Sequence, residues 1–245
     1  MTIGVLTTEN YRITLRAEFL CSSIKIPEGN CMRLRVIVAS LVLLSPGTWS
    51  ASAQDLKPVQ LPQPQKEIGK PLMQVLSLRQ SSREFNPRPL PLQDLSNLLW
   101  AADGINRTES GKRTAPSAMN WQETDVYVIL SDGAFLYDAK TNSLKPVIGG
   151  DVRALGGTQG FVKDAPLTLV YVVDYARMTK ANDEDKKLYG AADVGFIAEN
   201  AYLYCASQGL AVVVRGSVDR SRLAETLKLR PDQKIILAQT VGYPK

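Results

Sequence analysis

Two short stretches of this sequence carry residue types that suit the binding of an anionic ligand. The first, residues 79–85 (Arg-Gln-Ser-Ser-Arg-Glu-Phe), places two serines between two arginines. A guanidinium offers a planar set of N–H donors that fits a phosphate, and serine hydroxyls add neutral donors. The second, residues 113–122 (Arg-Thr-Ala-Pro-Ser-Ala-Met-Asn-Trp-Gln), follows farther along the chain. Taken separately, either stretch is equally consistent with a solvated turn, so the case for a phosphate site depends on what the rest of the chain provides.

Composition excludes several kinds of chemistry. The 245 residues include no histidine, which removes the Ser-His-Asp and Cys-His nucleophile systems in their usual form and the commonest metal ligand. The three cysteines have neither CxxC nor zinc-site spacing, so no metal site is predicted. Lysines and arginines are scattered along the chain despite the net charge of +5, which argues against nucleic-acid binding. A hydrophobic content of 44% supports a sizeable core.

Residues 32–53 have the three-part pattern of a secretory signal peptide. A basic start at Met32 is followed by an apolar run over 36–44 and by the small residues Ala-Ser-Ala at 51–53. The run is too short to span a bilayer as a helix, although an N-terminal membrane anchor is the alternative. We therefore expect a bacterial protein that is periplasmic or secreted, with no stable membrane anchor after cleavage.

The signal pattern begins at Met32 rather than at the first residue, so residues 1–31 are predicted to be a non-native upstream extension. The mature chain would begin at Gln54 and keep only Cys205, which precludes an intrachain disulfide. N-terminal sequencing of the native protein checks this, since a peptide from residues 2–31 in the mature protein would contradict it.

Helical signals surround the two stretches. Residues 54–66 carry three prolines among polar residues and predict an extended linker. Periodic apolar positions and their stop signals predict helices over four segments: from Glu67 or Pro71 to Arg79, from Pro91 to Gly104, from Ala191 to Ser207 before Gly209, and after a cap at Asp219. The third carries small residues from Ala191 to Ala201, which suit either a dimer contact or ordinary core packing.

Strand signals lie between these helices. Alternating or continuous apolar runs predict strands over residues 125–130, 134–137, 142–147, 166–173, 210–214 and 234–242. A hairpin turn is predicted at Asp132-Gly133. The glycine-rich residues 149–160 are expected to form a mobile loop leading into a short helix, and 179–187 an exposed loop or lid. Together these elements predict an α+β fold with a mixed sheet.

The two stretches, in this order, resemble the signature of the nitroreductase family of flavin mononucleotide (FMN) enzymes. There an Arg-x-Ser-x-Arg/Lys-x-Phe segment grips the FMN phosphate and a Pro-Ser-x-x-Asn-x-Gln segment lies along the flavin. The resemblance covers about residues 70–245 and continues in four further matches: Asp193-x-Gly195, Glu199-Asn200, Ala206-x-x-Gly209-Leu210 and Val241-Gly242-Tyr243-Pro244. The hairpin, with Gln159-x-Phe161-Val162 and Ala165-Pro166, is most similar to the branch that includes SagB-type oxidoreductases.

This resemblance implies an FMN-binding domain over residues 67–245. Its fold would be a nitroreductase-like mixed β-sheet flanked by helices, with a long central helix, in an intertwined homodimer that binds FMN at the subunit interface. The implied FMN-binding residues are Arg79, Ser81 and Arg83 at the phosphate, Gln80 at the ribityl chain or phosphate, Pro116, Ser117, Ala118, Met119 and Asn120 along the ring system, Arg215 and Gly216 near flavin N5 and O4, and Lys245 at the phosphate.

Two of these positions depart from the family pattern. Many members carry a basic residue well after the final Gly-Tyr-Pro, where this chain has only Lys245. Arg215 stands where an acidic or neutral side chain is usual. Its charge would favour an anionic substrate or the reduced, more negative flavin; alternatively, the side chain faces solvent and only its backbone matters.

The resemblance implies an FMN-dependent oxidoreductase with ping-pong hydride transfer and no catalytic side chain, because the flavin carries the hydride. NAD(P)H is the candidate electron donor, although an exported enzyme does not meet the cytosolic pool. The substrate would be a small molecule or a peptide. The alternative is a flavin-binding protein or scaffold with a degenerate site and no turnover.

Overall fold

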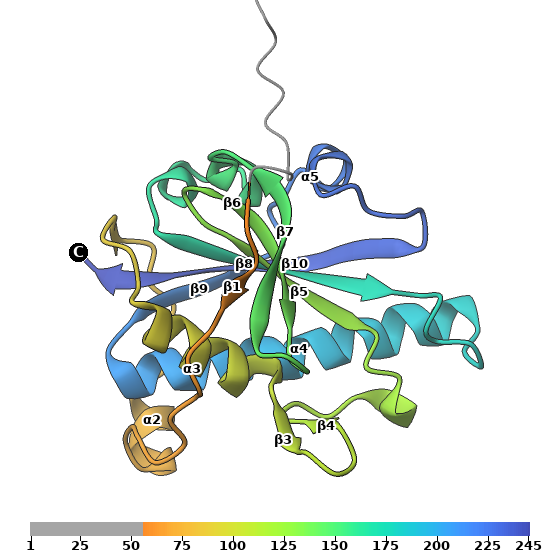
Figure 1. Ribbon diagram of the computed structural model, residues 1–245, viewed down its shortest axis with the longest axis horizontal. Helices are drawn as coiled ribbons and strands as arrows, with labels where there is room; N and C mark the ends of the chain where they lie inside the picture. Colours follow the sequence, from red (N-terminus) through yellow and green to blue (C-terminus); the bar gives the residue numbers. More distant parts are fainter. Residues whose placement is uncertain (1–55) are drawn as a thin grey trace, which may run out of the picture. The chain divides into compact units, whose positions relative to one another are not determined.

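The computed structural model describes residues 56–245, so the predicted signal peptide and upstream extension lie outside the described part (Figure 1). Its centre is an eight-stranded sheet in the order β1-β7-β6-β5-β8-β10-β2, with β9 also paired to β10. The strands are β1 (Val59–Gln60), β2 (Phe85–Asn86), β5 (Thr124–Ile129), β6 (Gly133–Asp138), β7 (Ser143–Gly149), β8 (Leu167–Asp174), β9 (Ala211–Arg215) and β10 (Gln233–Pro244). The small strands β3 (Ile105–Arg107) and β4 (Lys112–Arg113) form a separate hairpin.

The α+β class is confirmed, and the helices flank the sheet as expected. They are α2 (Leu72–Leu78), α3 (Leu92–Asp103), α4 (Asp183–Gln208) and α5 (Arg220–Thr226), with short 3-10 turns η2 (Ala118–Asn120), η3 (Arg153–Gly156) and η4 (Gly160–Lys163). Every strand pairing within the described sheet is antiparallel. The sequence predicts a mixed sheet, which would also include parallel pairs.

Strand β8 organises the core because all eight of its residues are buried. Successive side chains of a strand point to opposite faces. Leu169 and Tyr171 therefore join the cluster covered by α3 and α4, whereas Val170 and Val172 join the cluster covered by α5 and η3. The continuous apolar run in the sequence reflects this burial on both faces.

Helix α4 is the long central helix, and it begins earlier than expected. The Asn182 side chain accepts a hydrogen bond from Asp185 N at 2.8 Å, and three acidic residues fill the first turn, where the helix dipole favours negative charge. Part of the predicted exposed loop at 179–187 is therefore helix. The C-terminal end is as predicted, with Gly209 in the left-handed region at φ 71°.

The Pro-rich segment is extended, as expected, but it is part of the folded domain. Strand β1 pairs with β7, Leu61 is 2% exposed, and the Leu61 N–H donates to Asn142 O at 3.1 Å. The backbone of Gln65 also donates to the side chain of Asn97 on α3 at 2.8 Å. Prolines are tolerated here because β1 is an edge strand.

Candidate functional site

The basic segment (residues 79–85) is fixed against α4 and β9. The Ser82 N–H donates to Val212 O at 2.9 Å. Ser81 Oγ lies 2.8 Å from the hydroxyl of Tyr202 on α4, and that hydroxyl also accepts a hydrogen bond from Val214 N at 2.8 Å. Tyr202 thus ties the basic segment to the neighbouring strand. Sequence reasoning did not single out Tyr202; the available signal was a polar-tipped side chain on the buried face of the predicted helix.

The donors of the basic segment are accessible. Gln80, Ser81 and Arg83 are exposed, and the Arg79 guanidinium lies 5.4 Å from the Tyr202 ring centroid. Among the described residues, no carboxylate pairs with Arg79 or Arg83. The two charges are therefore available to an external anion, and the residues present fit a phosphate.

A hollow of about 360 Å³ adjoins the segment. Its lining includes Gln80, Ser82, Gly209, Val212 and Pro244. Pro244 of β10 pairs with Phe85 of β2, so the terminal Lys245 follows at this same end of the molecule. The structure thus brings together the basic segment and Lys245.

Strand β9 leads away from the basic segment to Gly216. Gly216 is the fourth residue after Val212, which contacts Ser82, and this corresponds to a rise of about 13 Å along a strand. A Cβ placed on Gly216 would find its nearest neighbour, an Arg220 side-chain nitrogen, only at 4.0 Å. The backbone at Gly216 is therefore open to close approach by a flat ligand.

The alternative in which the Arg215 side chain faces solvent is wrong. Arg215 belongs to β9, paired opposite Ala238, and is 6% exposed. It shares a strand face with Ala211 and Val213, which pack beneath Phe161. The direction of the Arg215 side chain is therefore set by the alternation of side chains between the two faces of β9, and not by the turn that follows.

The Arg215 guanidinium is buried without a counter-ion. It donates to Gly156 O at 3.1 Å and to the Thr240 hydroxyl, while its Nε has no partner. Its carbon Cζ lies 5.6 Å from the Phe161 ring centroid. A Cβ on Gly157 would stand 1.8 Å from Nη1, so only glycine permits this packing. Burial lowers the pKa of Arg215 to about 10, which leaves it charged at neutral pH.

The Pro-Ser segment (residues 116–120) forms a turn against the N-terminal half of α4. Met119 and Asn120 have φ values of 50° and 56°, in the sparsely populated left-handed region. The turn is held by side chains: Ala118 N donates to Asp193 Oδ2 at 2.8 Å, and Gln122 N donates to Ser117 Oγ at 2.8 Å. Met119 itself is 76% exposed.

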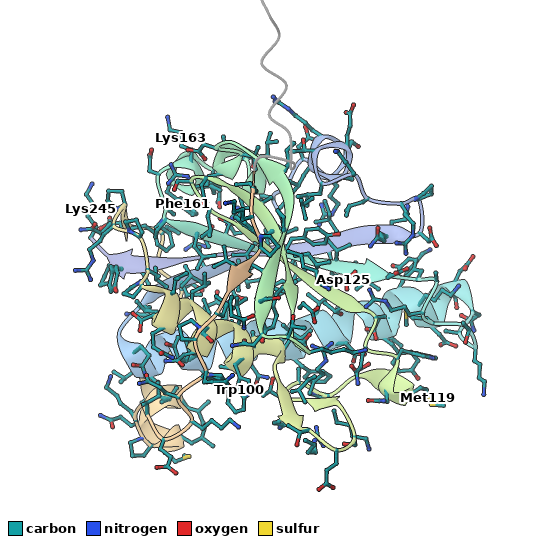
Figure 2. All side chains as sticks on the ribbon, in the orientation of Figure 1. Trp100, Met119, Asp125, Phe161, Lys163 and Lys245 are labelled. Atoms are coloured by element: carbon teal, nitrogen blue, oxygen red, sulfur yellow. The ribbon has the colours of Figure 1, made fainter. Side chains whose placement is uncertain are left out.

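A single chain does not bring the two segments together. Their contacts on α4, Tyr202 and Asp193, are nine residues apart, which is about 13 Å along a helix. Met119 and Lys245 lie on opposite sides of the molecule in Figure 2. Within one protomer, the Pro-Ser segment and the basic segment therefore lie on different parts of the surface.

Two buried carboxyl groups behind the Pro-Ser segment were missed by sequence reasoning. Glu123 is 0% exposed and accepts from Ser117 Oγ at 3.1 Å. Asp103, at the end of α3, pairs with Arg113 at 3.1 Å. Burial raises the pKa of Asp103 to about 7 even though Arg113 lowers it. No local pattern marks these side chains, since their neighbours come from other elements.

Helices α2 and α4 leave large apolar side chains uncovered. The exposed ones on these helices are Leu72, Met73, Leu76, Leu78, Leu188, Tyr189 and Phe196. By contrast, Ala198 and Ala201, on the predicted small-residue face, are buried within the chain's own core. Gly195 borders open space, because a Cβ added there would meet no atom within 4 Å. If α4 forms a dimer contact, it uses the face of Gly195 and Phe196.

The described residues contain neither a helix long and apolar enough to cross a membrane nor a group of three or more cysteine, aspartate and glutamate side chains placed to hold a metal.

Comparison with known proteins gives one consistent family. Residues 76–243 match the family model described as "Nitroreductase family". The chain is 31% identical over 169 residues to MJ1384 of Methanocaldococcus jannaschii, a protein assigned as a nitroreductase, covering 65% of this chain and 85% of that protein. A crystal structure of a Ralstonia eutropha JMP134 protein with the same assignment has a TM-score of 0.75 and 45% identity, covering 80% of this chain and 93% of that one.

A more distant relative is the NADPH-flavin oxidoreductase of Vibrio harveyi, 28% identical over 102 residues, which are 38% of this chain and 42% of that protein. These comparisons do not place the chain on the SagB-type branch, which stays a prediction.

Proposed function

The chain belongs to the nitroreductase family and is accordingly an oxidoreductase, and we propose that it binds FMN and transfers hydride between a donor and an acceptor that enter the same site in turn. The observation that carries the proposal is the pair of arginines in the basic segment. Arg79 and Arg83 have no carboxylate partner in residues 56–245, and β9 leads from their segment to the open backbone at Gly216.

Each part of the site would have a separate task. Arg79, Ser81 and Arg83 bind the phosphate, with Gln80 beside it and Lys245 at the same end. The backbone at Gly216 admits the ring system. When bound, FMN supplies the hydride chemistry, and the protein binds it, orients it and sets its electrostatic environment. No described side chain needs to act as acid or base.

We further propose that the site is completed by a second copy of the chain. The basic segment and the Pro-Ser segment lie on opposite sides of one protomer, and a partner subunit that supplies one of them would bring both to the same flavin. The uncovered apolar side chains on α2 and α4 support this, because exposed patches of this kind mark interaction surfaces.

Export through residues 32–53 stays part of the proposal, and it bears on the reductant. NADPH is named for the Vibrio harveyi relative, and NAD(P)H is the first donor to test here. For an exported enzyme, the physiological donor would be a different reductant or the substrate itself.

The proposed function is tested on the purified protein. We expect flavin absorbance bands, release of FMN on denaturation, and oxidation of NAD(P)H or another donor coupled to reduction of an acceptor. Protein that cannot be loaded with FMN would contradict the proposal. Bound FMN without turnover against any donor would favour the flavin-binding scaffold instead.

Phe196→Glu is expected to produce monomers that lose flavin. Burying a phenylalanine stabilises an interface by about 1.5–3 kcal/mol, and a symmetric dimer loses this twice while gaining an unpaired buried charge. Light scattering and flavin retention on gel filtration measure the result. Ser221→Glu on α5, an exposed position across the sheet, is the control. A Phe196→Glu protein that stays dimeric and yellow would remove this face from the interface.

A further inference from the structure

Two buried carboxyl groups, Asp193 and Glu123, accept hydrogen bonds from the Pro-Ser segment. Asp193 of α4 is 4% exposed and accepts the Ala118 N–H at 2.8 Å. Glu123, just before β5, is 0% exposed and accepts the Ser117 hydroxyl through Oε2 at 3.1 Å. Its other oxygen, Oε1, is buried without a donor. A fully buried carboxylate oxygen with no donor is costly, which requires an explanation.

The two carboxyl groups accept from the adjacent residues Ser117 and Ala118 and therefore lie close together. A hydrogen bond between them forms only when one of them carries a proton, because two carboxylates are acceptors alone. A proton on Glu123 Oε1, donated to Asp193, would give the unpartnered oxygen a bond. It would also leave one negative charge where two would repel.

The surroundings supply too few cations to neutralise both groups. Around the pair, Asp103 ends α3 and Asp125 lies on β5. The two arginines nearby are committed to these: Arg113 pairs with Asp103 at 3.1 Å, and Arg177 pairs with Asp125 at 2.6 Å. In the ion pairs formed by residues 56–245, neither Glu123 nor Asp193 has a basic partner.

We infer that Glu123 and Asp193 share one proton, and that the protonated pair is the positioning element that holds Ser117 and Ala118 in place. Glu123 carries the proton, Asp193 remains the carboxylate that accepts from Ala118 N, and the Ser117 hydroxyl completes the arrangement. Where it concerns flavin, the inference rests on the proposed function; where it concerns the turn itself, it does not.

Because Glu123 and Asp193 share a proton, the stability of the Pro-Ser turn depends on pH. Burial, with the charge of Asp193, raises the pKa of Glu123 from 4.5 to about 7 in the folded chain. A raised folded pKa stabilises the fold fully below the unfolded value, and this contribution is lost as pH rises through about 7. Above that pH, two adjacent anions repel behind the turn, and the Pro-Ser segment loosens.

The decisive comparison uses the flavin-free protein from pH 5 to 8.5. We measure denaturant unfolding and hydrogen exchange of the Ala118 amide in the wild type and in Glu123→Gln. The glutamine is neutral at every pH and can still donate to Asp193 while its carbonyl accepts from Ser117. Relative to this variant, the wild-type unfolding constant should rise roughly a hundredfold between pH 5 and pH 8.5.

Two further variants separate this role from general packing. Asp193→Asn removes the negative neighbour and adds an N–H donor, so it should move the wild-type pH transition to lower pH. Glu225→Gln makes the same chemical change at an exposed position on α5 and should leave the profile unaltered. Asp103 also titrates in this range, and the charge of Glu123 contributes to its raised pKa, so the comparison is repeated in an Asp103→Asn background.

Identical pH profiles for wild type and Glu123→Gln would overturn the inference. Should that variant fail to fold, a carbon-13 NMR titration of the Glu123 carboxyl in the wild type decides it, and a midpoint near 4.5 overturns it. FMN titrations at pH 5.5 and 8.5 form a separate arm, in which weaker binding at the higher pH supports the pair. No FMN binding at either pH would overturn the proposed function while the flavin-free comparison still decides the carboxyl pair.

Discussion

Removing both arginines of the basic segment is expected to weaken FMN binding by at least two orders of magnitude. A hydrogen bond to a charged group contributes about 1.5–3 kcal/mol, so each of Arg79→Ala and Arg83→Ala should weaken the affinity roughly ten- to a hundredfold. The described structure gives neither guanidinium a carboxylate partner, so neither substitution leaves a buried charge unpaired. The loss should therefore appear in binding and not in folding.

Two controls isolate the phosphate contact. Riboflavin lacks the phosphate, and its binding should be nearly insensitive to both substitutions. Arg88→Ala removes an exposed arginine that stacks 3.7 Å from the Tyr243 ring centroid, outside the basic segment, and should bind FMN like the wild type. Fluorescence titration of the flavin-free proteins measures all of these. If the double variant titrates with FMN as the wild type does, the phosphate assignment is wrong.

Local signals predicted the elements whose boundaries depend on local chemistry. The apolar run of β8, the hairpin before Gly133, the Asp219 cap and the Gly209 stop of α4 each involve residues close in sequence, and each is confirmed. The start of α4 was misjudged because charged residues at 183–187 suggest a loop. The Asn182 cap and the helix dipole favour helix there instead.

Features that depend on distant residues could not be predicted in this way. Part of the Pro-rich segment becomes strand β1 only because β7, more than eighty residues away in sequence, offers it an edge. Likewise, Glu123 and Asp193 meet only when α4 crosses behind the Pro-Ser segment. The basic segment and Lys245 were predicted to share a site, and β2 does bring them to the same end of the molecule.

Arg215 is the residue whose role changed most between sequence and structure. Its side chain is sealed beneath Phe161 and the glycine-rich loop, immediately before the open backbone at Gly216. Its pKa falls from 12.5 to about 10, and because a lowered base pKa means that the fold disfavours the cation, keeping it charged costs about 3 kcal/mol of stability at neutral pH. Uncompensated buried charges of this kind are often retained for function, at the expense of stability.

Arg215→Gln should lower the reduction potential of the bound flavin. At an effective dielectric of about 20, a unit charge acts on another about 8 Å away with roughly 2 kcal/mol, or about 45 mV for a two-electron couple. The Arg215 cation stabilises the negative charge that flavin gains on reduction. Without this cation, the reduced flavin is less stable and the potential falls. Arg215→Lys keeps the charge and should keep the potential. Redox titration and denaturant unfolding of the three proteins provide the measurement. A glutamine variant that is strongly destabilised, with its potential unchanged, would show that this guanidinium acts only in packing the glycine-rich loop against β9.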